Sequence, residues 1–288
     1  MEERLSTDTK ITLRNGIKIP IFGLGTWLSS NNGEAASAVT IALDTGYKMI
    51  DTAQMYGNES DLGLSINDWC CQYPNKERPF VVTKLKGDAH EQGSVTRALR
   101  RSLDLLRMEY VDLFLIHSPK GGRCVDTWKE MIECKKAGLV KTIGVSNFGV
   151  AQLEGLKAAG LELPEVNQIE LHPWLQQKKT REYMKENEIA SMGYCPLARC
   201  KQFGKTELAK LAEARSVPEA LLAIRWSLEE DIITIPKSSN SQRIAENASV
   251  FNLDPLTEEE RIAIAACDVG FKASNSVNSM DIPWSEVC

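Results

Sequence analysis

Short apolar runs alternate with longer amphipathic stretches along most of this sequence. The apolar runs, such as residues 80–83 and 111–116, have the length of buried strands. In the stretches between them, apolar residues recur every three or four positions, as they do in helices with one buried face. The first of these stretches carries its apolar residues at Ala35, Ala38, Val39, Ala42 and Leu43.

Eight strand-then-helix units can be counted from Phe22 onward. The expected strands are residues 22–24, 49–50, 80–83, 111–116, 142–145, 166–169, 190–193 and 232–235. The expected helices lie near residues 35–43, 62–69, 95–106, 128–138, 150–159 and 180–188, on both sides of 216–218, and from about 241. Because no linker rich in Pro, Gly or Ser separates the units, this order predicts a single (β/α)8 TIM-barrel domain over residues 1–288.

The two ends of the chain depart from this alternation. Asn15 and Gly16 separate two short strand-like runs within residues 11–20, which predicts a β-hairpin with a type I′ turn that caps the barrel. Residues 268–288 have no clear periodicity, so we expect a C-terminal loop that crosses the surface.

Composition excludes several classes of function. A formal net charge of −5 gives no reason to expect nucleic acid or an anionic membrane as a partner. No apolar run approaches the ~20 residues needed to cross a bilayer, and residues 1–4 contain no apolar signal segment. The eight cysteines are scattered without a CxxC pair, so we expect reduced thiols in a cytoplasmic protein.

Four chemically active side chains fall at or just beyond the ends of expected strands. Asp51 follows one apolar run and Tyr56 lies five residues further on, while Lys84 and His117 end two other runs. In a parallel barrel, catalytic groups are placed at the C-terminal ends of the strands. The sequence therefore predicts one site that combines an acid, a phenol, an amine and an imidazole.

Each of these residues also has a structural interpretation when it is taken alone. A strand-end Asp is often a hydrogen-bond acceptor or a helix cap, a loop Tyr is often a packed aromatic residue, and His117 could be a buried imidazole with satisfied nitrogens. Lys84 is less ordinary, because lysine is rarely drawn into a core unless it is paired. Pairing with Asp51 would place a cation beside Tyr56 and lower the phenol pKa from its usual ~10, which favours proton donation to a carbonyl oxygen.

Two other folds compete with this interpretation. A doubly wound dinucleotide fold would need a GxGxxG motif, but residues 23–27 read GLGTW and lack the third glycine. A metal-dependent barrel hydrolase would need several histidine ligands, but the chain has only His90, His117 and His172, without an HxH pair. We therefore expect no metal.

The sequence resembles the aldo-keto reductase family, of the aldose and aldehyde reductase-like type with short loops, over essentially its whole length. The motifs that carry the resemblance are GTW (25–27), DTAQMYGNE (51–59), VTKL (82–85), LIHSP (115–119), IGVSNF (143–148), NQIELHP (167–173), YCPL (194–197) and IPKSS (235–239). The resemblance implies that Asp51, Tyr56, Lys84 and His117 are the catalytic tetrad. Tyr56 would be the general acid, His117 would orient the substrate carbonyl, and Asp51 would hold Lys84.

The resemblance also implies residues that bind the cofactor NADPH/NADP+. Those expected at the nicotinamide are Ser146, Asn147, Gln168 and Tyr194, with Gly25 and Thr26 nearby, and those expected at the adenosine end are Lys237, Ser238, Arg243, Glu246 and Asn247. Taken alone, Ser146 and Asn147 would instead be interpreted as the N-cap of the next helix. Lys237 and Arg243 flank the start of the helix after the last strand, where phosphate is attracted, and two cations suit a 2′-phosphate.

The resemblance implies NADPH-dependent reduction of aldehydes and ketones to alcohols. Trp27, Met55 and His117 are expected to line the substrate pocket, and Trp284 would either join them or dock the tail. The loop 118–123 is short and starts with Ser118, where many vertebrate members have Trp, so a more open pocket is expected. The alternative is a cofactor-binding but non-catalytic structural or regulatory relative. We expect a monomer whose partner is a small carbonyl compound.

Overall fold

Eight parallel strands form the central ring of the computed structural model, which describes residues 4–87, 90 and 94–288. In chain order they are β3 (Leu24–Gly25), β4 (Met49–Asp51), β5 (Phe80–Leu85), β6 (Val111–Ile116), β7 (Val140–Ser146), β8 (Val166–Glu170), β9 (Ala190–Tyr194) and β10 (Ile233–Thr234). Each strand pairs with the next, and parallel bridges from Phe22 to Thr234 and from Gly25 to Lys237 close the ring. The predicted (β/α)8 barrel is confirmed. Residues 1–3 of the N-terminal segment lie outside the described residues.

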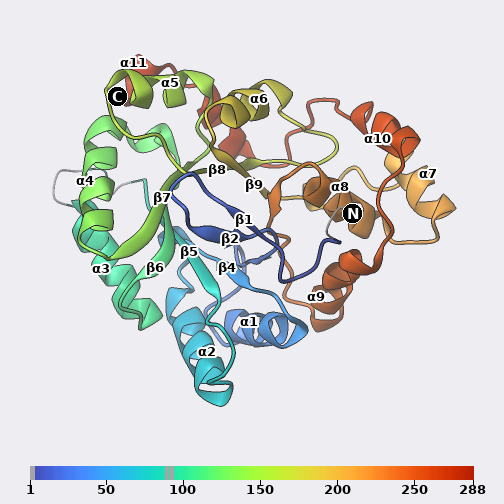
Figure 1. Ribbon diagram of the computed structural model, residues 1–288, viewed down its shortest axis with the longest axis horizontal. Coiled ribbons are helices and arrows are strands. Elements are labelled where there is room, and N and C mark those ends of the chain that lie inside the picture. The colour runs from blue at the N-terminus through green and yellow to red at the C-terminus, as the bar shows by residue number, and fades with distance from the viewer. Residues whose placement is uncertain (1–3, 88–89, 91–93) are drawn as a thin grey trace.

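Helices surround the ring and follow the strands (Figure 1). They are α1 (Glu34–Thr45), α2 (Glu59–Gln72), α3 (Ser94–Leu106), α4 (Cys124–Lys136), α5 (Val150–Ala158), α6 (Lys178–Glu186), α7 (Glu207–Ala214), α8 (Glu219–Glu229), α9 (Ser241–Ala248), α10 (Glu258–Ala265) and α11 (Trp284–Val287). The five apolar residues that predicted α1 are all buried. Helix α10 was not predicted, although Thr257 and Glu260 form a capping box at its start, a pattern that can be read in the sequence.

The N-terminal hairpin closes one end of the barrel. Its strands β1 (Lys10–Thr12) and β2 (Lys18–Pro20) cross the centre of the ring in Figure 1. Leu13 and Ile19 are buried against the apolar side chains that fill the barrel interior. Access to the interior is therefore left to the opposite end, where the strands terminate.

The hairpin turn differs from the predicted type I′ turn. Only Gly16 of the Asn15–Gly16 pair has a positive φ, of 84°. The amide of Leu13 donates to the carbonyl of Ile17, and the amide of Gly16 donates to the carbonyl of Leu13. This is a longer loop in which glycine alone takes the left-handed conformation, so the I′ prediction is wrong.

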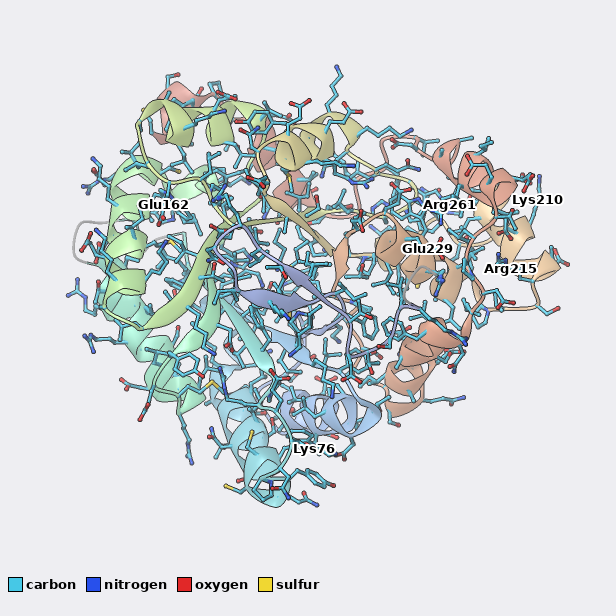
Figure 2. All side chains as sticks on the ribbon, viewed as in Figure 1. Lys76, Glu162, Lys210, Arg215, Glu229 and Arg261 are labelled. Carbon is cyan, nitrogen blue, oxygen red and sulfur yellow. The ribbon has the colours of Figure 1, made fainter. Side chains whose placement is uncertain are left out.

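Ion pairs attach the unpredicted helix α10 to the barrel. Glu229, at the end of α8, accepts hydrogen bonds from Arg225 and Arg261 and from the amide of Leu256. Figure 2 shows Glu229 and Arg261 together on this side of the molecule, with Arg215 close by. A buried carboxylate that is paired with two cations stabilises this helix contact.

The C-terminal tail is not the simple surface loop that was expected. It contains the 3₁₀ helix η5 (Asn275–Asp281) and α11, and it buries Val277, Met280 and Val287. Helix α11 lies beside α5 in Figure 1. At that contact the Trp284 ring lies so close to Gly155 that a Cβ there would be 2.2 Å from the ring. Packing against the barrel, rather than sequence periodicity, thus orders this segment.

All eight cysteines are free thiols. Within residues 4–87, 90 and 94–288, no helix combines the length and apolar character that a membrane span requires. In the same ranges, no three His, Cys, Asp or Glu side chains gather in a way that could hold a metal ion.

Candidate active site

A cavity of about 190 Å³ opens where the barrel strands end. It is lined by Gly25, Trp27, Asp51, Met55, Tyr56, His117, Ser146, Asn147, Gln168, Tyr194, Cys195, Arg199, Ile235, Lys237, Ser274 and Ser276. Three of the four residues predicted to be catalytic are among them, and the fourth, Lys84, is fully buried and contacts two of these three.

Neighbouring strands bring these side chains together. Asp51 is the last residue of β4, Lys84 is near the end of β5, and His117 directly follows β6. Because the three strands are parallel and paired in this order, their ends lie side by side at one end of the barrel. Tyr56 comes from the 3₁₀ helix η1 (Gln54–Tyr56), which ends at Gly57 in the left-handed conformation.

Lys84 and Asp51 form a buried ion pair below the cavity. The Nζ atom of Lys84 lies 2.6 Å from Oδ1 of Asp51, and it also donates to the carbonyl of Thr52 at 2.8 Å and to the Tyr56 hydroxyl at 3.2 Å. The second carboxylate oxygen of Asp51 accepts from the amide of Gln168 at 2.7 Å. Hydrogen bonds to both charges offset the large cost of burying them.

Burial opposes ionisation at both members of the pair. It raises the pKa of Asp51 and lowers the pKa of Lys84, and the contact between the two charges acts against both shifts.

The phenol pKa does not follow the sequence-based prediction. Burial, followed by the negative charge of Asp51, raises the pKa of Tyr56 well above its ordinary value. The expected lowering of the phenol pKa by Lys84 is therefore wrong, because burial and the Asp51 carboxylate both oppose ionisation of the phenol. Tyr56 keeps its proton at neutral pH, which is the state that a proton donor needs.

His117 is a neutral imidazole at the cavity wall. Burial, with a smaller effect of the Lys84 charge, lowers the pKa of His117 to about 3. Its ring meets the Tyr56 ring edge-on, with the two centroids 5.6 Å apart. A neutral imidazole in this place can donate one hydrogen bond to a carbonyl oxygen beside the phenol.

A hydrogen-bonded group of polar side chains forms the next part of the wall. The Tyr194 hydroxyl donates to Oδ1 of Asn147 at 2.7 Å, while Nδ2 of Asn147 donates to the carbonyl of His117 at 3.1 Å. Asn147 has a φ of 60°, a strained conformation for a residue other than glycine and one that is common at functional sites. The N-cap of α5 is Gly149, so the alternative in which Ser146 and Asn147 cap this helix is wrong.

The two cations predicted for the adenosine end lie in different places, one at the cavity and one in α9. Lys237 lines the cavity, and Arg243 is exposed in the first turn of α9, where its amide donates to the capping Asn240 side chain at 2.9 Å. Glu246 is exposed further along α9, whereas Asn247 is buried. Of the two cations, only Lys237 is part of the cavity lining.

Three other predicted binding residues are engaged in local structure. Gly25 approaches the end of the last strand so closely that a Cβ would lie 2.9 Å from the carbonyl oxygen of Ile235. The Thr26 hydroxyl is buried and donates to the carbonyl of Asp51 at 2.9 Å. The Ser238 hydroxyl accepts from the amide of Asn240 at 3.1 Å.

The outer rim of the cavity partly matches the residues expected for the substrate. Trp27 and Met55 line it, with 38% and 56% of their surfaces exposed. Trp284 does not line it, because its ring is packed on Gly155, and this prediction is corrected to a role in docking the tail.

Sequence reasoning missed five residues that line the cavity: Cys195, Arg199, Ile235, Ser274 and Ser276. Cys195 follows Tyr194 within a motif that was recognised, so adjacency was an available signal. The Arg199 guanidinium lies 4.6 Å from the centre of the Trp27 ring, a contact between residues far apart in the chain. The two serines come from the tail, where no pattern marked them.

Comparison with known proteins finds relatives over nearly the whole chain. The profile of the Aldo/keto reductase family matches residues 21–269. The chain belongs to the aldo-keto reductase family. This membership confirms the resemblance and the enzyme class, an oxidoreductase that uses NADP(H).

The relatives include enzymes with named activities. The chain is 35% identical over 262 residues to glyoxal reductase of Bacillus subtilis, covering 88% of this chain and 94% of that protein. It is 37% identical over 270 residues to methylglyoxal reductase DkgA of Escherichia coli, covering 92% and 96%. The solved aldo-keto reductase of Bombyx mori in complex with NADP is similar with a TM-score of 0.87 and 32% identity, covering 96% and 98%.

Proposed function

We propose that this protein reduces aldehydes and ketones to alcohols with NADPH, and that Tyr56 is the proton donor. One observation carries the proposal. The Tyr56 hydroxyl lies on the cavity wall, 3.2 Å from the ammonium group of a fully buried Lys84, which is itself 2.6 Å from Asp51. A buried ion pair aimed at a phenol has no simple structural explanation, because an apolar cluster would fill this place at a lower cost in desolvation.

The residues present fit the cofactor. Side-chain amides and hydroxyls of Ser146, Asn147 and Gln168 can pair with a carboxamide, and the ring of Tyr194 offers a flat face. The cations Lys237 and Arg243 suit the phosphates, and the remaining adenosine contacts are assigned to Ser238, Glu246 and Asn247. When bound, NADPH supplies the hydride that the carbonyl carbon accepts.

Side chains of the protein orient the carbonyl and transfer the proton to its oxygen. The substrate oxygen accepts a hydrogen bond from the neutral His117 and lies beside the Tyr56 hydroxyl. As negative charge develops on that oxygen, the Tyr56 proton moves to it and completes the alcohol. The phenolate left behind is stabilised by the Lys84 ammonium, whose charge acts strongly in this buried place. Solvent then returns a proton to Tyr56.

Small, oxygen-rich carbonyl compounds are the proposed substrates. The cavity is only about 190 Å³, and its rim carries the Ser274 and Ser276 side chains and Arg199 beside the apolar Trp27 and Met55. Two relatives named for reduction of glyoxal and methylglyoxal support this class. Because the loop that begins at Ser118 is short, we expect that larger aromatic aldehydes can also enter.

The test is to mix the protein with NADPH and either methylglyoxal or an aromatic aldehyde, and to follow the loss of nicotinamide absorbance. Reduction of both is expected, with one alcohol formed per NADPH consumed. A non-catalytic relative would bind NADPH, as seen by fluorescence, without oxidising it. That result would refute the proposal.

A further inference from the structure

Glu170 is a fully buried carboxylate that the proposed reaction does not use. It is the last residue of β8, and both of its oxygens accept hydrogen bonds from the backbone of the C-terminal tail. Oε1 accepts from the amide of Ala273 at 2.5 Å, and Oε2 accepts from the amide of Ser274 at 2.8 Å. Hydrogen bonds from backbone amides to a carboxylate are among the stronger hydrogen bonds in proteins, so this part of the tail is held firmly.

His172 completes the attachment. Its Nε2 atom lies 3.0 Å from Oε1 of Glu170, and its ring packs on Trp174 and on Phe271 of the tail. The amide of Phe271 donates to the carbonyl of Trp174 at 2.9 Å. The strand end and the loop after it therefore hold the tail over residues 271–274.

The tail segment held in this way is part of the cavity wall. Ser274 and Ser276 line the cavity. Glu170 is also the strand partner of Tyr194 across β8 and β9. Burial, followed by the negative charge of Glu170, raises the pKa of Tyr194, the phenol proposed to face the nicotinamide. Glu170 is thus connected to both the substrate rim and the cofactor wall.

The rest of the tail is attached independently. The Gln152 amide donates to the carbonyls of Ser279 at 2.9 Å and Ile282 at 2.7 Å, and Trp284 is packed on Gly155. Loss of the Glu170 contacts would therefore release residues 273–276 without detaching the whole tail. Stability alone does not explain the buried charge of Glu170, since apolar packing would avoid the cost of desolvating it.

We infer that Glu170, oriented by His172, is a positioning residue that fixes residues 273–276 as a preformed wall for the substrate and for the nicotinamide end of the cofactor. This inference rests on the proposed function for its kinetic consequences. The attachment itself can be measured without turnover.

The test compares Glu170→Gln with Asp112→Asn. Asp112 is the control for loss of a buried carboxylate elsewhere: it accepts from the amide of Val81 at 2.9 Å and pairs with Arg78 and Lys141. It lies at the start of β6 and so at the opposite end of the barrel. Hydrogen exchange of residues 271–276 is measured by mass spectrometry, together with NADPH affinity, KM and kcat. The glutamine side chain keeps one acceptor oxygen but loses one charge-assisted hydrogen bond to the tail. The hydrogen exchange of this segment, which reports its opening, is therefore expected to increase about ten- to a hundredfold.

The expected kinetic result is a split between binding and turnover. In Glu170→Gln, KM for the aldehyde and the Kd for NADPH rise at least about threefold, while kcat changes by less than about twofold, because ground-state and transition-state binding are lost together. In Asp112→Asn, these values and the exchange of residues 271–276 stay as in the wild type. Unchanged exchange in Glu170→Gln, or faster exchange with unchanged KM and Kd, overturns the inference, as do equal changes in the control.

Two provisions keep the outcomes separate. If Glu170→Gln does not fold, Glu170→Asp keeps the charge but is too short to reach both amides and His172 at once, and the same changes in exchange and Kd are expected. If the wild type does not reduce carbonyls, the proposed function fails, while exchange and NADPH affinity still decide whether Glu170 positions the wall.

Discussion

Replacing Lys84 with methionine separates the two roles that its charge could have. Methionine keeps an unbranched side chain of similar length and removes the ammonium. In the wild type that ammonium serves three acceptors: Asp51 at 2.6 Å, the Thr52 carbonyl at 2.8 Å and the Tyr56 hydroxyl at 3.2 Å. In Lys84→Met, Asp51 is left with the Gln168 amide and without its cation.

The cost to stability follows from burial. Both side chains are almost fully buried, with 0% and 2% exposed, and an uncompensated buried charge costs about 3–5 kcal/mol. Burial already raises the pKa of Asp51, and loss of Lys84 raises it further. Above the unfolded pKa of about 3.9, the folded variant then holds a proton that the unfolded chain has released. Its stability therefore falls as pH rises, by up to about 1.4 kcal/mol per pH unit.

The double variant Asp51→Asn with Lys84→Met removes both charges and serves as the control. Urea unfolding at pH 5 and pH 7 and single-turnover oxidation of NADPH are measured on both variants. If Lys84 stabilises the phenolate, the double variant regains stability but not rate, and the chemical step stays slower by about 10²–10⁴-fold. Recovery of the rate together with stability would mean that Lys84 only neutralises Asp51 and would refute this reasoning.

Two further predictions concern the cofactor and pH. Arg243→Ala is expected to weaken NADPH binding about ten- to a hundredfold through loss of charge-assisted hydrogen bonds to the 2′-phosphate, and to leave NADH affinity unchanged. Fluorescence titration of both cofactors checks this, with a variant of the exposed neighbour, Gln242→Ala, as the control. Equal losses of affinity for both cofactors would contradict the prediction. Burial lowers the pKa of His117 to about 3 in the folded protein, whereas in the unfolded chain this imidazole takes up a proton below about pH 6.5. Protonation therefore favours the unfolded chain, and wild-type stability falls as pH drops. In His117→Asn the fall between pH 6.5 and pH 5 should be smaller by up to about 2 kcal/mol in urea unfolding, and an identical fall would rule out the neutral imidazole.

The strand-end residues could be located from the sequence because barrel geometry constrains them. Once Asp51, Lys84 and His117 are assigned to the ends of consecutive parallel strands, their side chains must meet at one end of the ring. Tyr56 follows from its short distance along the chain to Asp51. Periodicity of apolar residues was enough for this step.

The remaining features depend on contacts that periodicity does not encode. The direction of the Tyr56 pKa shift depends on how deeply the phenol is buried and on how close the Asp51 charge lies to it, which sequence spacing does not reveal. The contact between Glu170 and Ser274 spans 104 positions and ends in a segment without a pattern. The sequence left Trp284 with two roles, lining the pocket or docking the tail, and only the close approach to Gly155 decides between them.

Tyr56→Phe tests the central claim most directly. The change removes the hydroxyl and keeps a ring of nearly the same shape. NADPH affinity and the single-turnover rate of NADPH oxidation with an aldehyde are measured on the same preparation. We predict that NADPH still binds as in the wild type while the rate falls by at least about 10²-fold, the usual contribution of a general acid. A variant that retains most of the wild-type rate would contradict the assignment of Tyr56 as the proton donor.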